Sequence, residues 1–412
     1  MNLENIEIKE KIYIIQPILS DNFKSSHEEA ISLIQSAEAE YIGTSFQKIR
    51  EITPSTFIGL GKLNEIRNHL SGLNNITVLF NGDLSPSQTL NISAALDNIK
   101  VIDRTTLILD IFALRAKTSE GKLQVELAQL KYIYPRLKGK GADLSRLGGG
   151  IGTRGPGETQ LETDRRHIRL RIKFLEKKLS ELKLRRKQLS DRRMKKQQRT
   201  ISLLGYTNVG KSTLLNLLTE ADVYVENKLF ATLDPTTRNM ILDDKQFLLT
   251  DTVGFLQDLP HDLIEAFHST LESAVNSDLL LIVCDATGDY DMQLATTLET
   301  IKELNCTTPY LIVINKCEKI SDFDKFPPNS IFISAKTGMG IESLKAKILN
   351  HFKATLSEMR LSIPYSKMSE YSLLKKYLTE KSFTYFDDHI EIFAETDTSY
   401  LHLFQKFRIN PD

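Results

Sequence analysis

A glycine-rich octapeptide is the part of the chain best suited to chemistry. Residues 205–212 read Gly-Tyr-Thr-Asn-Val-Gly-Lys-Ser, which matches the phosphate-binding pattern GxxxxGK[ST]. Glycines let backbone N–H groups wrap a β-phosphate, Lys211 brings a cation to the β and γ oxygens, and Ser212 offers a hydroxyl to Mg²⁺. The predicted nucleotide-binding residues here are Gly205, Tyr206, Thr207, Asn208, Val209, Gly210, Lys211 and Ser212, with Lys211 also catalytic.

Two segments further along the chain indicate which base the site accepts. Asn315-Lys-Cys-Glu is close to the guanine-reading pattern NKxD, and Ser-Ala-Lys follows at 334–336. A carboxylate accepts hydrogen bonds from guanine N1–H and the exocyclic amine, whereas adenine has no such pair of donors. Glu318 stands where aspartate is usual, so it keeps this acceptor chemistry but changes the reach, which could weaken guanine selectivity. The predicted guanine-binding residues are Asn315, Lys316, Glu318, Ser334, Ala335 and Lys336.

The segments between these motifs are suited to sensing the γ-phosphate. In the run Asp251, Thr252, Val253, Gly254, we expect Asp251 to hold Mg²⁺ through water and the Gly254 N–H to bind the γ-phosphate. Upstream lie Phe230, Ala231, Thr232, Leu233 and Asp234, followed by Pro-Thr-Thr. We expect Thr232 to be the second magnesium ligand, with Thr236 as the alternative. Thr232 and Gly254 join Lys211 as predicted catalytic residues.

Position 255, directly after this run, is Phe rather than the glutamine with which Ras-type GTPases orient the attacking water. A phenyl ring cannot hydrogen-bond water for attack. Intrinsic hydrolysis should therefore be slow, and a partner would supply or order the missing machinery. His261 and His268 could substitute, although solvated helix residues are the alternative interpretation.

Strands and helices at the right places must carry these motifs. Strand-like runs at 200–204, 246–250 and 310–314 each end at one motif, which predicts an α/β P-loop domain over 199–352. Residues 1–115 read as a second α/β domain, and 353–412 as a small α+β domain with a helix at 371–381 and a strand at 389–393. Gly59, Gly61 and Lys62 are better explained by a turn into a helix than by a second nucleotide loop.

Residues 116–198 have helical rather than α/β patterning. Apolar residues recur at spacings of three and four from Leu123 to Leu137, where Pro135 should kink or end the helix. A seven-residue repeat follows from Leu161 to Leu189, which is typical of coiled-coil packing. We expect an antiparallel helical hairpin whose tip is the glycine-rich stretch 139–157.

The hairpin is also the basic part of a chain whose formal net charge is zero. Arg165 to Arg199 holds sixteen Lys and Arg against three Asp and Glu, too few acids for interleaved salt bridges. The tip has eight glycines in nineteen residues, with Arg146 and Arg154 among them. A solvated helix and a flexible linker are the bland alternatives, but both features favour contact with RNA.

Composition narrows the class and the compartment. Hydrophobic residues make up 41% and charged residues 26%, which is globular, and no apolar run reaches membrane-spanning length. The N-terminus has no pattern of a secretory signal. The three cysteines have neither disulfide nor zinc-site spacing. We therefore expect a cytoplasmic protein. The nucleotide motifs predict Mg²⁺ as the cofactor and GTP and GDP as substrate and product, and we expect a monomer.

Together, the tip, the run from Thr153 to Ile168, the basic helix and the segment from Leu229 to Arg238 ahead of Asp-Thr-Val-Gly-Phe resemble the HflX family of translation-factor-class GTPases. The resemblance implies binding to the large ribosomal subunit and its RNA with GTP, faster hydrolysis when bound, and splitting or rescue of stalled 70S ribosomes under stress. It also implies a tip that enters the peptidyl-transferase region, and a cytoplasmic protein partly associated with ribosomes or membranes.

Two other functions stay open from the residues alone. The first is a ribosome-assembly or RNA-binding switch in which the nucleotide only times attachment. The second is a P-loop ATPase or kinase, because GxxxxGK[ST] by itself does not select the base. Competition between ATP and labelled GTP would decide the second.

Overall fold

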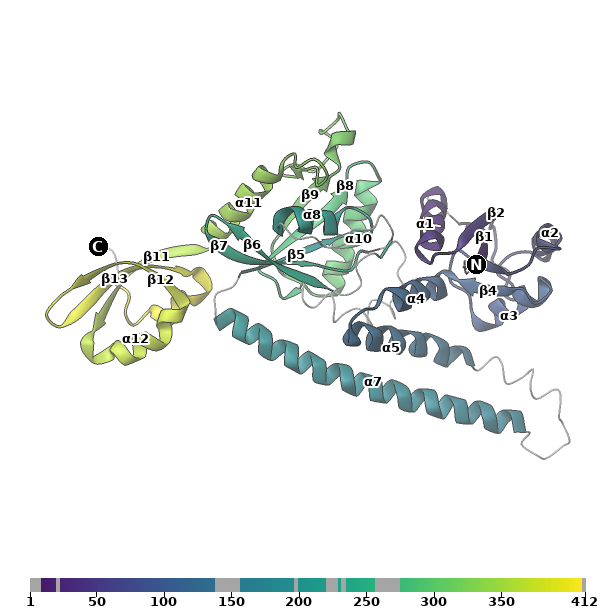
Figure 1. The fold of residues 1–412 in the computed structure, drawn as a ribbon, viewed down its shortest axis with the longest axis horizontal. Coiled ribbons are helices and arrows are strands. Elements are labelled where there is room, and N and C mark those ends of the chain that lie inside the picture. The colour runs from purple at the N-terminus through teal and green to yellow at the C-terminus, as the bar shows by residue number, and fades with distance from the viewer. Residues whose placement is uncertain are drawn as a thin grey trace, which may run out of the picture.

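The computed structural model describes residues 9–19, 23–137, 156–195, 199–219, 229–230, 235–255 and 275–409. Three separate β-sheets succeed one another along the chain, with a helical hairpin between the first two (Figure 1). The protein is thus an α/β multidomain chain, as its sequence predicts. Among the described residues, none of the helices has the length and apolar character that a membrane span requires.

The N-terminal sheet is parallel throughout, in the order β2-β1-β3-β4. Its strands are β1 (Lys11–Ile18), β2 (Glu40–Lys48), β3 (Ile76–Phe80) and β4 (Lys100–Asp103). Helices alternate with them as α1 (Phe23–Ser36), α2 (Leu60–Leu70), α3 (Pro86–Ala95) and α4 (Arg104–Arg115). Parallel strands need such crossovers, which bury both faces of the sheet. One face packs on α1 and α4, the other on α2 and α3.

Gly59 is the residue before the first turn of α2, and Lys62 pairs with Glu65 on that helix at 2.8 Å. The structure therefore agrees with the turn-into-helix interpretation of this segment.

Two antiparallel helices follow, α5 (Ser119–Arg136) and α7 (Pro156–Lys195), and Figure 1 shows them side by side, with α7 running well past the start of α5. Forty residues make α7 roughly 60 Å long at about 1.5 Å per residue. Leu175 of the predicted stripe is fully buried between the helices, and Arg171 pairs with Glu126 across them. Pro135 lies in the last turn of α5, as expected. Residues 139–155 of the glycine-rich tip lie outside the described residues.

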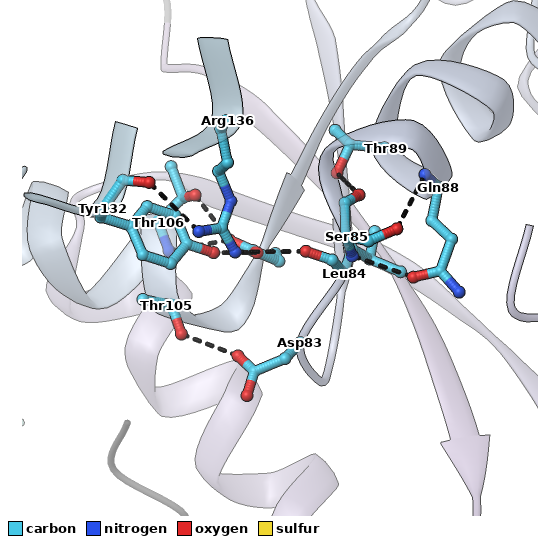
Figure 2. A network of polar contacts seen from close by, with 10 residues as sticks. Asp83, Leu84, Ser85, Gln88, Thr89, Thr105, Thr106, Tyr132 and Arg136 are labelled. Atoms are coloured by element: carbon cyan, nitrogen blue, oxygen red, sulfur yellow. Dashed lines mark hydrogen bonds and ion pairs between the residues drawn. The ribbon is translucent and has the colours of Figure 1, made fainter. Parts of the chain in front are cut away.

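The end of α5 is fastened to the carboxyl edge of the N-terminal sheet by a polar network (Figure 2). Tyr132 Oη donates to the Asp103 carboxylate, which also caps α4 by accepting from Thr106 N at 3.0 Å. Arg136 stacks on the Tyr132 ring at 3.4 Å and donates to the Leu84 carbonyl at 3.2 Å. Because Asp103 is buried, water screens its bonds little, and the network holds the hairpin to this domain.

The central sheet has the order β10-β9-β8-β5-β7-β6, in which only β6 is antiparallel to its neighbour. Its strands are β5 (Arg199–Gly205), β6 (Thr236–Leu242), β7 (Lys245–Asp251), β8 (Leu279–Asp285), β9 (Tyr310–Asn315) and β10 (Ile331–Phe332). Helices α8 (Lys211–Thr219) and α11 (Ile341–Ala354) pack on one face, and α10 (Tyr290–Glu303) on the other. The carboxyl ends of β5, β7, β8 and β9 thus share one edge, where open α/β sheets bind ligands.

The C-terminal sheet is antiparallel, β11-β13-β12, with β11 (Leu356–Pro364), β12 (Leu378–Tyr385) and β13 (His389–Asp397). One face is covered by α12 (Met368–Leu374) and short 3₁₀ turns. The helix predicted over 371–381 is wrong in its second half. Residues 378–381 begin β12, because Leu378 enters the core and pairs with Thr396. Long-range pairing overrode the local helical pattern.

Candidate nucleotide site

The phosphate-binding loop stands between β5 and α8, as the motif requires. Gly205 has φ +145°, and a Cβ there would lie 2.1 Å from the Val283 carbonyl of neighbouring β8. Gly210 has φ +94°, and its Cβ would lie 2.4 Å from Asn315 Nδ2. No side chain fits at either position, so both glycines are needed for the loop to pass close to its neighbours.

Lys211 and Ser212 open α8 and point back into this loop. The Lys211 ammonium is buried and donates to the carbonyls of Tyr206 at 2.7 Å and Gly205 at 3.1 Å. Burial lowers the pKa of Lys211 to about 8, and the charge of Asp251 opposes that shift. Ser212 Oγ donates to Asp251 Oδ2 at 2.6 Å. The cation, hydroxyl and carboxylate predicted from separate motifs therefore meet in one place.

The oxygens present suit a hard cation such as Mg²⁺. The Ser212 hydroxyl and the Asp251 carboxylate are adjacent, and magnesium at nucleotide sites uses one or two protein ligands together with phosphate oxygens. The described residues accordingly contain no cluster of three or more acidic, His or Cys side chains that could hold a metal by themselves. Thr207 Oγ1 is buried without a hydrogen-bond partner in the described structure, which leaves a donor inside the loop.

The run from Asp251 to Phe255 lies against the loop. A Cβ on Gly254 would lie 2.8 Å from Lys211 Nζ and from Thr207 Cα, so only glycine fits. Thr252 is fully buried and donates to the Leu203 carbonyl at 2.7 Å. Phe255 N donates to the Gly205 carbonyl at 3.1 Å, and its ring is buried in the core under α10. Phe255 is therefore a packing residue, in line with its predicted inability to orient water.

The base-reading motifs meet on the other side of the loop. Asn315 Nδ2 donates to the Val209 carbonyl at 2.8 Å, and Asn315 Oδ1 accepts from Ala335 N at 2.9 Å. Lys316 Nζ donates to the Asn208 carbonyl at 3.0 Å. One asparagine thus ties the phosphate-binding loop to both segments predicted to bind guanine.

The remaining residues of these motifs differ in exposure. Ser334 is fully buried, and its Oγ accepts from Thr337 N at 3.1 Å, which shapes the turn. Glu318, in the 3₁₀ turn Cys317–Lys319, and Lys336 are both exposed. The role of Glu318 in reading the base stays a prediction.

Part of the predicted site cannot be placed. Ala231, Thr232, Leu233, Asp234, His261 and His268 lie outside the described residues. The alternative ligand Thr236 is described, and it pairs in register with Asp251 across β6 and β7. The choice between the two threonines stays a prediction.

Contacts with the N-terminal domain are the feature that the motifs did not predict. Tyr206 Oη, from the phosphate-binding loop, donates to Glu29 Oε1 at 2.5 Å, and Glu29 pairs with Arg104 at 2.5 Å. The Phe230 ring is buried 4.5 Å from the ring of Phe112, edge to face. The one sign of this contact between domains in the motif itself is the aromatic residue inside the phosphate-binding loop.

The same interface includes residues beside the motifs. Val253 and Leu229 belong to the core cluster of the N-terminal domain, and Leu229 N donates to Ser36 Oγ at 2.9 Å. The N-terminal domain is therefore contacted by Tyr206 of the phosphate-binding loop, by Leu229 and Phe230 ahead of Thr232, and by Val253 after Asp251.

Three family models match successive parts of the chain. The model "GTP-binding GTPase N-terminal" matches residues 24–113, "GTP-binding GTPase Middle Region" matches 115–193, and "50S ribosome-binding GTPase" matches 200–316. Among solved structures, a GTP-binding protein from the hyperthermophilic archaeon Sulfolobus solfataricus in complex with GDP is 27% identical. It matches 83% of this chain and 98% of that one with a TM-score of 0.46.

Two relatives match along most of the chain. GTPase HflX of Caldanaerobacter subterraneus subsp. tengcongensis is 46% identical over 371 residues, which are 89% of this chain and 86% of that protein. GTPase HflX of Escherichia coli (strain K12) is 42% identical over 350 residues, or 82% of this chain and 81% of that protein. The chain therefore belongs to the HflX family of GTPases and is a GTP-hydrolysing enzyme.

Proposed function

We propose that this GTPase binds the large ribosomal subunit in its GTP form, hydrolyses GTP faster when bound, and splits or rescues stalled 70S ribosomes under stress. The family description of residues 200–316 as a 50S ribosome-binding GTPase supports the partner. The observation that carries the proposal is the packing of Phe230, Val253 and Tyr206 on the N-terminal domain. A change at the γ-phosphate then alters how that domain and its hairpin are held.

In the nucleotide site, each residue would have a separate task. The Lys211 ammonium, which donates to two loop carbonyls, would bind the β and γ oxygens of the nucleotide. The phosphates would supply the negative charge that stabilises this buried cation. Ser212 would hold Mg²⁺ directly and Asp251 through water, with Thr232 completing the set. When bound, Mg²⁺ neutralises charge that develops on the phosphates.

The predicted γ-phosphate contact is the Gly254 N–H. Because a side chain at 254 would collide with Lys211, the backbone there can approach a phosphate closely. GTP would order the segments 230–237 and 251–255, and loss of phosphate would release them. With Phe255 buried in the core, the ribosome is the proposed source of the missing catalytic help.

The hairpin supplies the proposed RNA contact. Its second helix is basic, and described cations such as Arg166, Lys173 and Lys177 are exposed. Phosphate contacts of this kind bind RNA with strong salt dependence. The tip, with Arg146 and Arg154, would enter the peptidyl-transferase region. Such a protein would be a cytoplasmic monomer that associates with ribosomes.

Measuring GTP hydrolysis with and without large subunits tests the proposal. We expect stimulation by large subunits that weakens as salt rises from 50 to 200 mM, values chosen around physiological ionic strength. No stimulation at low salt would contradict the proposed partner. A second experiment lets unlabelled ATP or GTP compete with labelled GTP. If ATP displaced the label as well as GTP does, guanine selectivity would be contradicted.

Sedimentation of intact 70S ribosomes separates the two ribosomal functions. With protein and GTP, appearance of free subunits supports splitting. Binding to immature large subunits alone would support the assembly switch instead. Replacing Arg146 and Arg154 by Ala should weaken the stimulation while nucleotide affinity stays unchanged, and equal stimulation would remove the tip from the mechanism.

A further inference from the structure

We infer that Asp285 is a positioning residue for guanine-nucleotide binding, which acts by holding Lys316 against the phosphate-binding loop. Asp285 is the last residue of β8, and its Oδ2 lies 2.5 Å from Lys316 Nζ. The same ammonium donates to the Asn208 carbonyl at 3.0 Å. One cation thus ties together the phosphate-binding loop, the end of β8 and the guanine-reading loop after β9.

The carboxylate of Asp285 is held in place by its own turn. Its Oδ1 accepts from Thr287 N at 2.9 Å and from Thr287 Oγ1 at 2.7 Å, which leaves Oδ2 for the ammonium. The buried Gln293 of α10 accepts from Asp285 N at 2.8 Å. A Cβ on Gly288 would lie 2.7 Å from Gln293 Nε2, so the turn is closed around this amide. A preformed turn loses little conformational entropy when it acts.

The Asp285 and Lys316 pair is not an ordinary surface ion pair. The two side chains are 14% and 25% exposed, so water screens their attraction less than it would at an open surface. Lys316 also has φ +64°, a left-handed conformation that a side chain disfavours. Both interactions of its ammonium hold the residue in that conformation. Removing the carboxylate would leave a half-buried cation with one carbonyl partner.

We expect the loss of Asp285 to affect binding of the base and not binding of the phosphates. Lys316 lies between Asn315 and Glu318, so releasing it loosens the loop that reads guanine. The contacts of Lys211 with the loop and of Ser212 with Asp251 do not pass through Asp285. Loss of Asp285 should therefore weaken nucleotide affinity and leave the rate of the bound complex unchanged.

The test compares Asp285→Asn with the wild-type chain by titrating a fluorescent GDP analogue and by steady-state GTP hydrolysis. We expect about tenfold weaker GDP binding and a higher KM for GTP, with kcat within about twofold. Asp289→Asn is the matched control, since Asp289, four residues after Asp285, caps the N-terminus of α10 and asparagine caps equally well. Its affinity should stay at the wild-type value.

Two further variants make the inference specific to Lys316. Asp285→Glu keeps the charge and should recover affinity to within about threefold of wild type, which a purely structural loss would not. In a Lys316→Met background, Asp285→Asn should have no further effect on affinity. The same loss in both backgrounds, an unchanged affinity in Asp285→Asn, or a loss confined to kcat would each overturn the inference.

Discussion

The base side and the switch side of the nucleotide site are built in different ways. On the base side, Asn315 and Lys316 bond to carbonyls of the phosphate-binding loop, and the hydrogen-bond partners of both side chains among the described residues lie within the central domain. On the switch side, Phe230 and Val253 are buried against the N-terminal domain, to which Tyr206 also bonds. The residues predicted to recognise guanine thus lie within one domain, whereas those predicted to sense the γ-phosphate also contact a second domain.

The difference separates two properties that a molecular switch needs. Affinity for the base must be the same before and after hydrolysis, so a rigid base-binding site formed within one domain suits this property. A response to the γ-phosphate must change a distant surface, and the residues predicted to sense it are the ones that contact a second domain. The comparison predicts that mutations on the two sides have separable effects.

Gly210→Ala should have the largest effect, because it strikes where the base side joins the phosphate-binding loop. The new Cβ would meet Asn315 Nδ2, and φ +94° is strained for alanine. We expect roughly 1,000-fold weaker GDP binding, about 4 kcal/mol, by calorimetric titration. Gly338→Ala is the control, since it has φ +83° but nothing within 4 Å. Equal losses would mean that strain alone explains the result.

Phe230→Ala should release the switch side while the base side stays intact. Its buried ring contacts Phe112 across the two domains, so its loss should cost about 3 kcal/mol of that contact. We expect lower thermal stability and faster proteolysis between the domains, with GDP affinity within about threefold of wild type. Phe383→Ala, at an exposed ring, should change neither. A large loss of GDP affinity would break the proposed separation.

Tyr206→Phe should have a smaller effect, because it removes a single hydrogen bond. The ring stays, but the bond to Glu29 is lost, which we expect to cost about 1.5 kcal/mol of domain contact. Thermal melts of Tyr206→Phe, Glu29→Gln and the double variant measure the coupling. Additive losses would show that the bond does not couple the domains.

Glu318→Asp should have the smallest effect, confined to the base side. The exposed carboxylate would then have the side-chain length that is usual at this position. We therefore expect a two- to fivefold greater preference for guanosine over inosine nucleotides, which lack the exocyclic amine. The melting temperature should not change. Weaker discrimination would indicate that glutamate fits this site better than aspartate.

Much of the site could be predicted because its motifs are local. The glycines, Lys211 and Ser212 are neighbours in the chain, and the strand before them is a short apolar run that needs no partner to be recognised. Strand ends likewise placed Asp251 and Asn315 at one edge of a parallel sheet. The hairpin followed from its heptad spacing. The divisions after residues 115, 198 and 352 stay predictions.

Errors and omissions arose where contacts are distant in sequence. Residues 378–381 have a helical pattern but pair with β13, which no local rule shows. Asp285 ends an ordinary apolar strand, and nothing in its neighbours marks it as a partner of Lys316, 31 residues away.

A phosphate-binding loop, a guanine-reading segment and a basic helical hairpin could be predicted from the sequence, because each depends on residues close together in the chain. The contact between the predicted γ-phosphate sensors and the N-terminal domain became visible only in the folded chain. Glu29 and Tyr206 are 177 residues apart, and they meet because Phe230 and Val253 of the central domain pack into the hydrophobic core of the N-terminal domain. Packing between distant segments has no periodicity that a sequence can display.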